Sequence, residues 1–253
     1  MNRRRWLTGA AATLGAAFVA ACDQVTKAAS VRQALRMAEG LTRRVQRLIL
    51  PREALAPTYD RADISPDFRP NGSTNPQASD YLALKAGGFA DYRLVVDGLV
   101  ERSLSLSLAE LRARPAQSQI TKHDCVEGWT SIAEWTGVRL AALLDEAGLK
   151  PQARYIVFHC FDALDQREDG ERYYESIDLI DARHPQTILA WAMNGRTLAV
   201  AHGAPLRLRV ERQIGYKHAK YIRRIEAVES FAHLGGGRGG YWEDRGYEWY
   251  AGI

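Results

Sequence analysis

Cys125 is the residue of this sequence best suited to chemistry, because it lies in an unusually polar stretch, Lys122-His123-Asp124-Cys125-Val126-Glu127-Gly128-Trp129. Polar neighbours and a glycine favour an accessible thiolate, which is the form of cysteine that binds soft metals and acts as a nucleophile. Two alternatives stay open from the residues alone. Cys125 could be a small buried hydrophobic residue, or it could form a disulfide with Cys160 in an oxidising compartment.

Other catalytic signatures are weak or missing in the sequence. Residues 235–240 (Gly-Gly-Gly-Arg-Gly-Gly) formally match the GxGxxG pattern of dinucleotide sites. No strand–helix unit surrounds them, so a turned loop is the better interpretation. The sequence has no GxSxG, HExxH, P-loop or CxxC motif, and its three cysteines argue against a zinc site built on cysteine pairs.

Composition and charge exclude several classes of protein. The chain has 253 residues, 46% of them hydrophobic and 25% charged, which is typical of a globular protein with a sizeable core. The formal net charge is +4, but residues 1–21 carry three arginines and no acid, and residues 22–58 have a net charge of +4. Residues 59–253 therefore carry a net charge of −3, the opposite of a nucleic-acid-binding surface, and no nucleic-acid partner is expected.

The elements that must position Cys125 are short strands with few helices. Strands are predicted over residues 92–100, 155–161, 206–210 and 222–228. Met193-Asn194-Gly195-Arg196 predicts a hairpin turn between two more strands. Because strands do not alternate regularly with helices, the expected class is α+β with mixed sheets of short strands, not doubly wound α/β.

Helix and loop signals complete the body of the chain. Ser107 can cap a short helix that ends at Arg112, and residues 138–147 predict a helix that Gly148 terminates. Pro51, Pro57 and the polar stretch of residues 66–76 indicate a loop before the body.

The first 21 residues resemble an export signal. Three arginines precede an apolar run that is short for a membrane-spanning helix. The order Asn2-Arg3-Arg4-Arg5-Trp6-Leu7 resembles a twin-arginine signal. Val19-Ala20-Ala21-Cys22 resembles a bacterial lipobox, in which Cys22 is lipidated, and Asp23 resembles a signal for retention at the inner membrane. The alternative is an N-terminal anchor that is never cleaved.

Residues 27–50 predict an amphipathic helix. Apolar residues recur at three- and four-residue spacing from Val31 to Leu48, and five arginines fill the other faces. Such a basic helix can lie on an anionic membrane surface, or its apolar stripe can pack on the body of the same chain. We therefore expect a signal peptide over residues 1–21, a lipid-anchored helix and linker over residues 22–58, and an enzyme domain over residues 59–253.

The segment around Cys125 resembles the cysteine segment of the sulfite oxidase superfamily of molybdopterin-dependent oxidoreductases, and is most similar to its periplasmic methionine sulfoxide reductases. The resemblance runs from about residue 63 to residue 229 in the family's order and spacing. The further motifs that carry it are Tyr173-Tyr174-Glu175-Ser176-Ile177, Met193-Asn194-Gly195, His202-Gly203-Ala204-Pro205-Leu206-Arg207 and Gly215-Tyr216-Lys217-His218-Ala219-Lys220. It implies a sulfite oxidase-type molybdopterin-binding fold.

The resemblance also implies roles for individual residues. Cys125 matches the thiolate that binds molybdenum. At the position of Cys160 the sulfoxide reductases have a threonine that contacts the cofactor. A cysteine thiol is a weaker hydrogen-bond donor than a threonine hydroxyl. Contacts to the pterin and its phosphate are implied for Asn71, His202, Arg207, Lys217, His218 and Lys220. Candidates to orient substrate or move protons are His123, Asp124, Glu127 and Tyr173.

Departures from the sulfite oxidases point to a neutral substrate. Sulfite oxidases follow their cysteine with an arginine-bearing segment, whereas Glu127 stands here, and Lys217 replaces an arginine. A dianion needs fixed positive charge, so a sulfoxide or an N-oxide suits this site better than sulfite. The aromatic residues of the C-terminal tail match neither family, and packing is their expected role.

The resulting hypothesis is an oxidoreductase that transfers an oxygen atom through molybdenum-molybdopterin and acts as a monomer at the periplasmic face of the bacterial inner membrane. Electrons must pass to or from a separate carrier, for which a cytochrome is expected, because no haem-attachment CxxCH motif occurs. One alternative is a sulfite-oxidising dehydrogenase of the same fold. An alternative of another class is a periplasmic interaction module that holds no metal.

Overall fold

The computed structural model describes residues 29–253 except residues 166, 168 and 169. The signal peptide predicted over residues 1–21 and the lipidation predicted at Cys22 lie outside the described residues. The chain divides into two compact units, Met1–Leu50 and Pro51–Ile253.

Helix α2 (Ala29–Ile49) forms the described part of the first unit. It occupies the segment in which apolar spacing predicts a helix. Arg47 lies in its last turn, where the helix dipole favours positive charge. Within residues 29–253, apart from the three omitted, no helix combines the length and the apolar character needed to cross a membrane.

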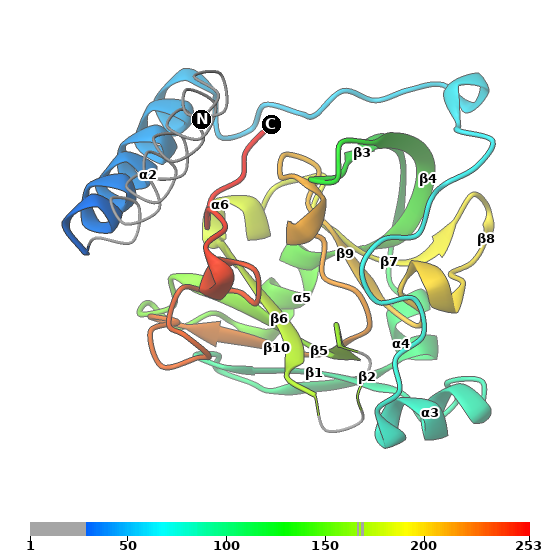
Figure 1. The fold of residues 1–253 in the computed structure, drawn as a ribbon. Helices are drawn as coiled ribbons and strands as arrows, with labels where there is room; N and C mark the ends of the chain where they lie inside the picture. Colours follow the sequence, from blue (N-terminus) through cyan, green and yellow to red (C-terminus); the bar gives the residue numbers. More distant parts are fainter. Residues whose placement is uncertain (1–28, 166, 168–169) are drawn as a thin grey trace, which may run out of the picture. The chain divides into compact units, whose positions relative to one another are not determined.

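One sheet of the second unit has the strand order β2-β1-β10-β5-β6 (Figure 1). Its strands are β1 (Arg93–Gly98), β2 (Leu104–Ser107), β5 (Tyr155–Ala163), β6 (Arg172–Asp178) and β10 (Ile222–Val228). Strands β1 and β10 pair in parallel, and the other neighbours pair antiparallel. The sheet is therefore mixed, as the sequence predicts.

The second sheet has the order β3-β4-β7-β8, with β9 also paired to β7. Its strands are β3 (Ala116–Asp124), β4 (Thr130–Arg139), β7 (Ile188–Met193), β8 (Arg196–Thr197) and β9 (Arg207–Arg209). Asn194 and Gly195 connect β7 to β8 with φ angles of 50° and 72°. Positive φ at both positions is the geometry of the predicted hairpin turn.

Short helices connect the strands. They are α3 (Ser79–Ala86), α4 (Leu108–Arg112), α5 (Leu140–Ala147) and α6 (Leu179–Ala182), with single 3-10 turns at Arg61–Asp63, Val200–His202, Gly215–Lys217 and Glu243–Arg245. Ser107 caps α4 as predicted, since its side chain accepts a hydrogen bond from the Glu110 backbone N–H. The helix predicted from residue 138 begins only at Leu140, because Val138 and Arg139 pair with β7.

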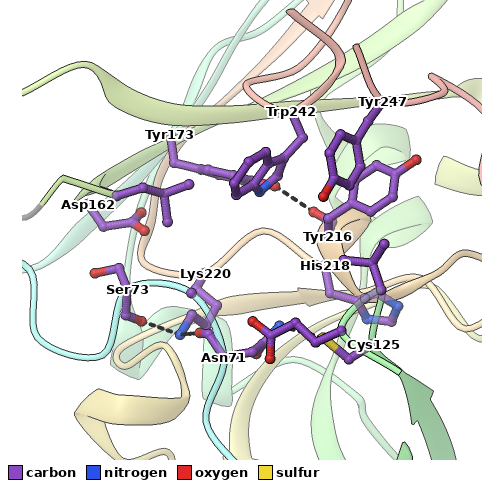
Figure 2. A pocket seen from close by; sticks show the side chains of 15 residues that line it. Asn71, Ser73, Cys125, Asp162, Tyr173, Tyr216, His218, Lys220, Trp242 and Tyr247 are labelled. Carbon is purple, nitrogen blue, oxygen red and sulfur yellow. Dashed lines mark hydrogen bonds between the residues drawn. The ribbon is translucent and has the colours of Figure 1, made fainter. Parts of the chain in front are cut away.

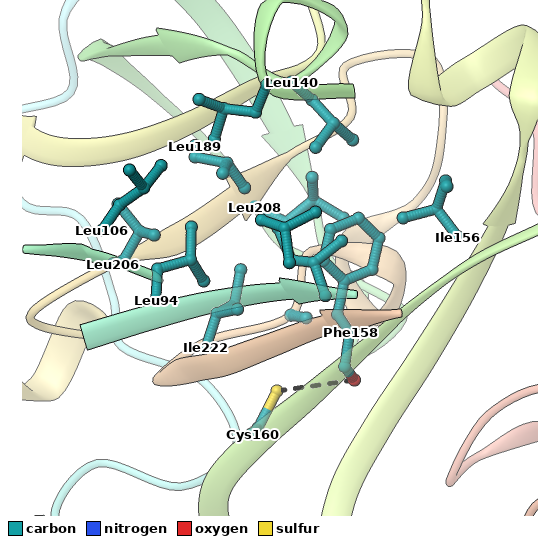
Figure 3. Packing of buried hydrophobic residues seen from close by; sticks show 14 of the residues in the cluster. Leu94, Leu106, Leu140, Ile156, Phe158, Cys160, Leu189, Leu206, Leu208 and Ile222 are labelled. Carbon is teal, nitrogen blue, oxygen red and sulfur yellow. Dashed lines mark hydrogen bonds between the residues drawn. The ribbon is translucent and has the colours of Figure 1, made fainter. Parts of the chain in front are cut away.

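The hydrophobic core contains residues from both sheets (Figure 3). Leu94 of β1, Phe158 of β5 and Ile222 of β10 come from the first sheet, and Leu189 of β7 and Leu208 of β9 come from the second. All five are fully buried. With few helices and two sheets of short strands, the second unit is an α+β domain, which confirms the predicted class.

Candidate active site

A tight turn between β3 and β4 presents Cys125. The Cys125 backbone N–H donates to the Trp129 carbonyl at 2.9 Å, and the Gly128 N–H donates to the Cys125 carbonyl at 3.0 Å. Gly128 has a φ of 86°, a conformation that glycine adopts without a steric penalty. Burial raises the pKa of the Cys125 thiol above its ordinary value, so the thiol becomes a thiolate most readily when a metal takes the place of its proton.

Cys125 opens onto a cavity of about 150 Å³ (Figure 2). Its walls come from the loop at residues 71–73, the turn at residues 125–127, the end of β5, the loop at residues 215–220 and the C-terminal segment. The lining residues are Asn71, Gly72, Ser73, Cys125, Val126, Glu127, Asp162, Leu164, Tyr173, Gly215, Tyr216, His218, Lys220, Trp242 and Tyr247.

One side of the cavity is polar, and we call Asn71, Ser73, Cys125, His218 and Lys220 the polar side. The Lys220 ammonium donates to the backbone carbonyls of Asn71 at 2.6 Å, Ala201 at 3.2 Å and Ser73. The Asn71 amide points its nitrogen at the Cys125 sulfur, 4.0 Å away. Burial and Arg207 lower the pKa of Lys220 to about 7. The buried Ser73 hydroxyl has no hydrogen-bond partner among the described residues.

Arg207 and His202 do not line the cavity but lie near Lys220, and Arg207 adds a buried positive charge there. The Arg207 guanidinium donates to the His202 carbonyl at 2.9 Å and lies 4.7 Å above the Trp135 ring. Burial and the neighbouring Arg209 lower the pKa of Arg207 to about 9. Within the described part of the chain, Arg207 has no ion-paired carboxylate, and Arg207 Nε and His202 Nδ1 have no hydrogen-bond partner. A buried cation in this state favours an anionic ligand.

The two histidines of the motifs differ in access. His218 lines the cavity, and its Nε2–H donates to the Gln213 carbonyl at 2.9 Å, which leaves Nδ1 as an unpartnered acceptor among the described residues. His123 does not line the cavity, and its Nδ1 accepts a hydrogen bond from Arg209 at 2.9 Å. Burial and Arg209 hold the pKa of both imidazoles well below the ordinary range. Both imidazoles are therefore neutral, and His123 lies outside the cavity lining.

The remaining substrate-side candidates are also placed differently from one another. Glu127 lines the cavity, and its carboxylate accepts a hydrogen bond from the Trp129 indole at 2.9 Å. Asp124 lies outside the lining and accepts from the Thr130 hydroxyl at 2.7 Å. Tyr173 lines the cavity, and its hydroxyl donates to the Tyr216 carbonyl at 2.6 Å. Burial raises the pKa of the Tyr173 phenol, so it remains protonated.

Two further residues implied as cofactor contacts also lie outside the lining. Cys160 is 1% exposed, belongs to the hydrophobic core and does not line the cavity. Cys125 and Cys160 are both free thiols, so the disulfide alternative is wrong for this structure. The buried Lys217 ammonium forms ion pairs at 2.5 Å with Glu175 and with Glu243 and lies outside the lining. It faces the C-terminal segment instead of the cavity.

The structure adds lining residues that the sequence motifs did not indicate: Ser73, Asp162, Trp242 and Tyr247. Asp162 is 3% exposed, and its Oδ1 has no hydrogen-bond partner among the described residues. Burial raises the pKa of its carboxyl to about 7, against the opposing effect of Lys220. A carboxylate two residues after Cys160 was the available signal in the sequence.

Tyr173, Tyr216, Trp242 and Tyr247 form the other wall, which we call the aromatic side (Figure 2). The Trp242 and Tyr247 ring centroids are 5.1 Å apart, with the rings tilted relative to each other. The Tyr247 and Tyr216 centroids are also 5.1 Å apart, and this pair packs edge to face. The sequence predicts packing as the role of the aromatic residues of the C-terminal tail. Trp242 and Tyr247 do pack against each other, but they also line the cavity.

Comparison with known proteins gives a consistent result. Residues 83–233 match the family described as "Oxidoreductase molybdopterin binding domain". A relative from Azospira oryzae, named as a candidate protein-methionine-sulfoxide reductase subunit YedZ1, is 34% identical over 250 residues, which is 99% of this chain and 87% of the relative.

Further similarities cover less of the chain. The protein-methionine-sulfoxide reductase catalytic subunit MsrP of Xanthomonas campestris pv. campestris is 36% identical over 155 residues, which span 58% of this chain and about half (48%) of that relative. Among solved structures, the sulfane dehydrogenase SoxCD from Paracoccus pantotrophus aligns with a TM-score of 0.50 and 26% identity, over 56% of this chain and 39% of that chain.

Proposed function

This chain belongs to the oxidoreductase molybdopterin-binding domain family, and we propose that it reduces a small neutral oxide, a sulfoxide or an N-oxide, at the cavity of Cys125. The observation that carries the proposal is the lining beside the thiol, which includes Glu127 but no arginine, since the nearby Arg69 is exposed and lies outside it. The names of the relatives, which include methionine sulfoxide reductase subunits, favour a methionine sulfoxide among these oxides.

The residues present fit molybdopterin, which combines a phosphate, a hydrogen-bonding pterin and two sulfur atoms. Arg207 supplies buried positive charge for the phosphate, and its Nε lacks a partner within the described part of the chain. His218 Nδ1 and the Ser73 hydroxyl are further unpartnered polar groups there. Cys125 would hold the metal through its sulfur. When bound, molybdopterin supplies a two-electron centre that exchanges an oxygen atom with the substrate.

The charge around the thiol favours a neutral substrate. The Glu127 carboxylate is fixed by the Trp129 indole. Glu127 is exposed, so solvent weakens but does not remove the repulsion that its carboxylate exerts on a second anion beside it. Among the described residues that line the cavity, Lys220 is the only one with a cationic side chain, and its ammonium already donates to three carbonyls. A sulfoxide or an N-oxide brings no such charge.

Reduction of a sulfoxide consumes two electrons and two protons and yields a thioether and water. Asp162 is suited to hold one of these protons at Oδ1, since that oxygen has no partner among the described residues and the pKa of the carboxyl is about 7. The Tyr173 hydroxyl keeps its proton and donates it in a hydrogen bond to the Tyr216 carbonyl, so its role is to shape the wall of the cavity. The electrons would come singly from a separate carrier, for which a cytochrome is our proposal.

We further propose that the protein is exported by the twin-arginine route and anchored through Cys22 at the periplasmic face of the inner membrane. The motifs of residues 2–7 and 19–22 and the basic sequence of helix α2 support this placement. Replacing Arg3 and Arg4 with lysine should leave the cofactor-loaded protein in the cytoplasm. Normal export of that variant would contradict the proposed route.

The function is tested by comparing two activities of the cofactor-loaded protein. We expect reduction of methionine sulfoxide or trimethylamine N-oxide with reduced viologen to exceed oxidation of sulfite with ferricyanide by at least about tenfold, because Glu127 opposes an anion. Efficient sulfite oxidation without oxide reduction would favour the sulfite-oxidising alternative. A purified chain that binds no molybdenum would instead favour a non-catalytic interaction module.

A further inference from the structure

The C-terminal segment, residues 234–253, contributes directly to the cavity although the family match ends at residue 233. Trp242 and Tyr247 line the same space as Cys125, and they face it from the side opposite Asn71 and Lys220 (Figure 2). Both rings are half-buried and packed against each other, and Tyr247 also packs against Tyr216 of the loop that carries His218. The segment is thus a wall of the active site.

Buried charges fix this segment to the domain. Lys217 bridges Glu175 of β6 and Glu243, the residue next to Trp242, at 2.5 Å to each carboxylate. All three side chains are at most 1% exposed. Burial and the nearby Glu243 raise the pKa of Glu175 well above its ordinary value, which reduces the charge that the cluster must balance. Removing one partner of such a cluster leaves an uncompensated buried charge, which is costly. The ion pair with Lys217 therefore holds Glu243 in place.

Backbone and side-chain hydrogen bonds hold the rest of the segment. The Tyr216 hydroxyl donates to the Glu248 carbonyl at 2.6 Å, and the Ile214 N–H donates to the Ala251 carbonyl at 2.9 Å. The Trp249 indole donates to the Ser176 hydroxyl at 2.8 Å. These bonds join the segment to β6 and to the loop at residues 213–218. The two lining rings are therefore presented by a fixed support and not by a loose tail.

We propose that Trp242 and Tyr247 form the substrate-selecting wall of this active site and favour oxides whose sulfur carries an apolar substituent. Aromatic rings make favourable contacts with sulfur and with alkyl or aryl groups. The polar side holds the groups that fit the cofactor, so the aromatic side is the part of the cavity left to contact the substituents of the substrate. This inference deepens the proposed function and rests on it.

The experiment compares two sulfoxides of different size in the cofactor-loaded protein. For methyl p-tolyl sulfoxide, Trp242→Ala should raise KM by about tenfold, because it removes aromatic contacts to sulfur and ring. For dimethyl sulfoxide, which offers little apolar surface, KM should change by less than about twofold. Trp242→Phe should restore most of the selectivity. Arg245→Gln, on an exposed residue of the same segment that does not line the cavity, is the matched control and should leave both KM values unchanged.

A binding measurement separates this inference from the proposed function. Calorimetry with methyl p-tolyl sulfide, the thioether product, requires no turnover, and Trp242→Ala should weaken its Kd by about tenfold. If Trp242→Ala is poorly folded, Tyr247→Leu carries the same comparison. Unchanged selectivity and unchanged thioether binding in these variants would overturn the inference. Failure of the wild type to reduce either sulfoxide, with thioether binding still dependent on Trp242, would instead overturn the proposed function alone.

Discussion

The two sides of the cavity differ in how completely their polar groups are satisfied. On the polar side, Ser73 and His218 keep unpartnered atoms, and the adjacent Arg207 is a buried cation with no ion-paired carboxylate among the described residues. On the aromatic side, the hydroxyls of Tyr173 and Tyr216 already donate to backbone carbonyls. The polar side therefore keeps buried groups for a ligand, whereas the two buried hydroxyls of the aromatic side are already satisfied by the protein. Substitutions on the two sides should separate cofactor binding from substrate selection.

The largest effect is expected from the thiol of the polar side. Cys125→Ser should lower activity by at least about 100-fold, more than the loss of an outer contact to a metal site typically costs, because a hydroxyl is a poor ligand for a soft metal. The assay is sulfoxide reduction, with the absorption spectrum of the metal as a second readout. Cys160→Ser, in the core, should have a much smaller effect. Equal losses in both variants would show that the contrast between the two cysteines is wrong.

The support of the aromatic side should show the largest effect on stability. Lys217→Met leaves Glu175 and Glu243 buried without their cation, so the free energy of unfolding should fall by about 3–5 kcal/mol. Thermal and urea unfolding measure it, and Lys150→Met, on a partly exposed lysine, is the control. If Lys217→Met is as stable as the wild type but loses its cofactor, Lys217 contributes to cofactor binding and not to the support of the aromatic side.

Arg207 tests whether the polar side awaits an anion. Arg207→Gln should weaken retention of the cofactor by about 10- to 100-fold, as expected for the loss of a charge-assisted hydrogen bond. The measurement is the pterin released per chain after dialysis. Arg183→Gln, on an exposed arginine that pairs with Asp145, serves as the control. Full retention in Arg207→Gln would mean that the phosphate lies elsewhere.

The smallest predicted effect concerns the proton held by Asp162, between the two sides. Because the pKa of its carboxyl is about 7, the protonated form is lost as the pH rises above 7. The reductase rate should then fall by about tenfold per pH unit. Lys220 is the charged group that acts on the Asp162 carboxyl, and Asp162 in turn raises the pKa of Cys160, Tyr81, Tyr173 and Tyr221. Asp162→Asn should lower the rate at acidic pH and flatten this dependence, whereas Asp91→Asn should not. An unchanged profile would exclude Asp162 as the proton donor.

Local signals predicted much of the fold. The turn at Asn194 and Gly195, the cap at Ser107 and the strand at β10 depend on nearby residues, and the structure has all three. Strand β3 was not predicted, because its buried positions include Gln119. That side chain is satisfied by Glu211 and by the Gln186 carbonyl, which are distant in sequence. Hydrophobic periodicity cannot detect a buried position of this kind.

The same limit applies to the site. Cys125 was identified from its own neighbours, and the structure places its thiol at the cavity. Lys217 was expected to contact the cofactor, yet its side chain turns toward Glu175 and Glu243, which are 42 and 26 residues away. Trp242 and Tyr247 reach the cavity through the same long-range anchoring. Motif spacing predicts which loops approach the cofactor, but tertiary contacts decide which side chains face it.

The molybdenum content of the purified wild-type chain tests the central claim most directly. If the polar side binds molybdopterin as we propose, the chain should contain about one molybdenum and one pterin, as for enzymes whose cofactor carries the redox chemistry. A chain that folds with the thiol of Cys125 free and contains neither molybdenum nor pterin, even when produced in a host that makes the cofactor, would contradict the assignment of this cavity as an oxidoreductase site.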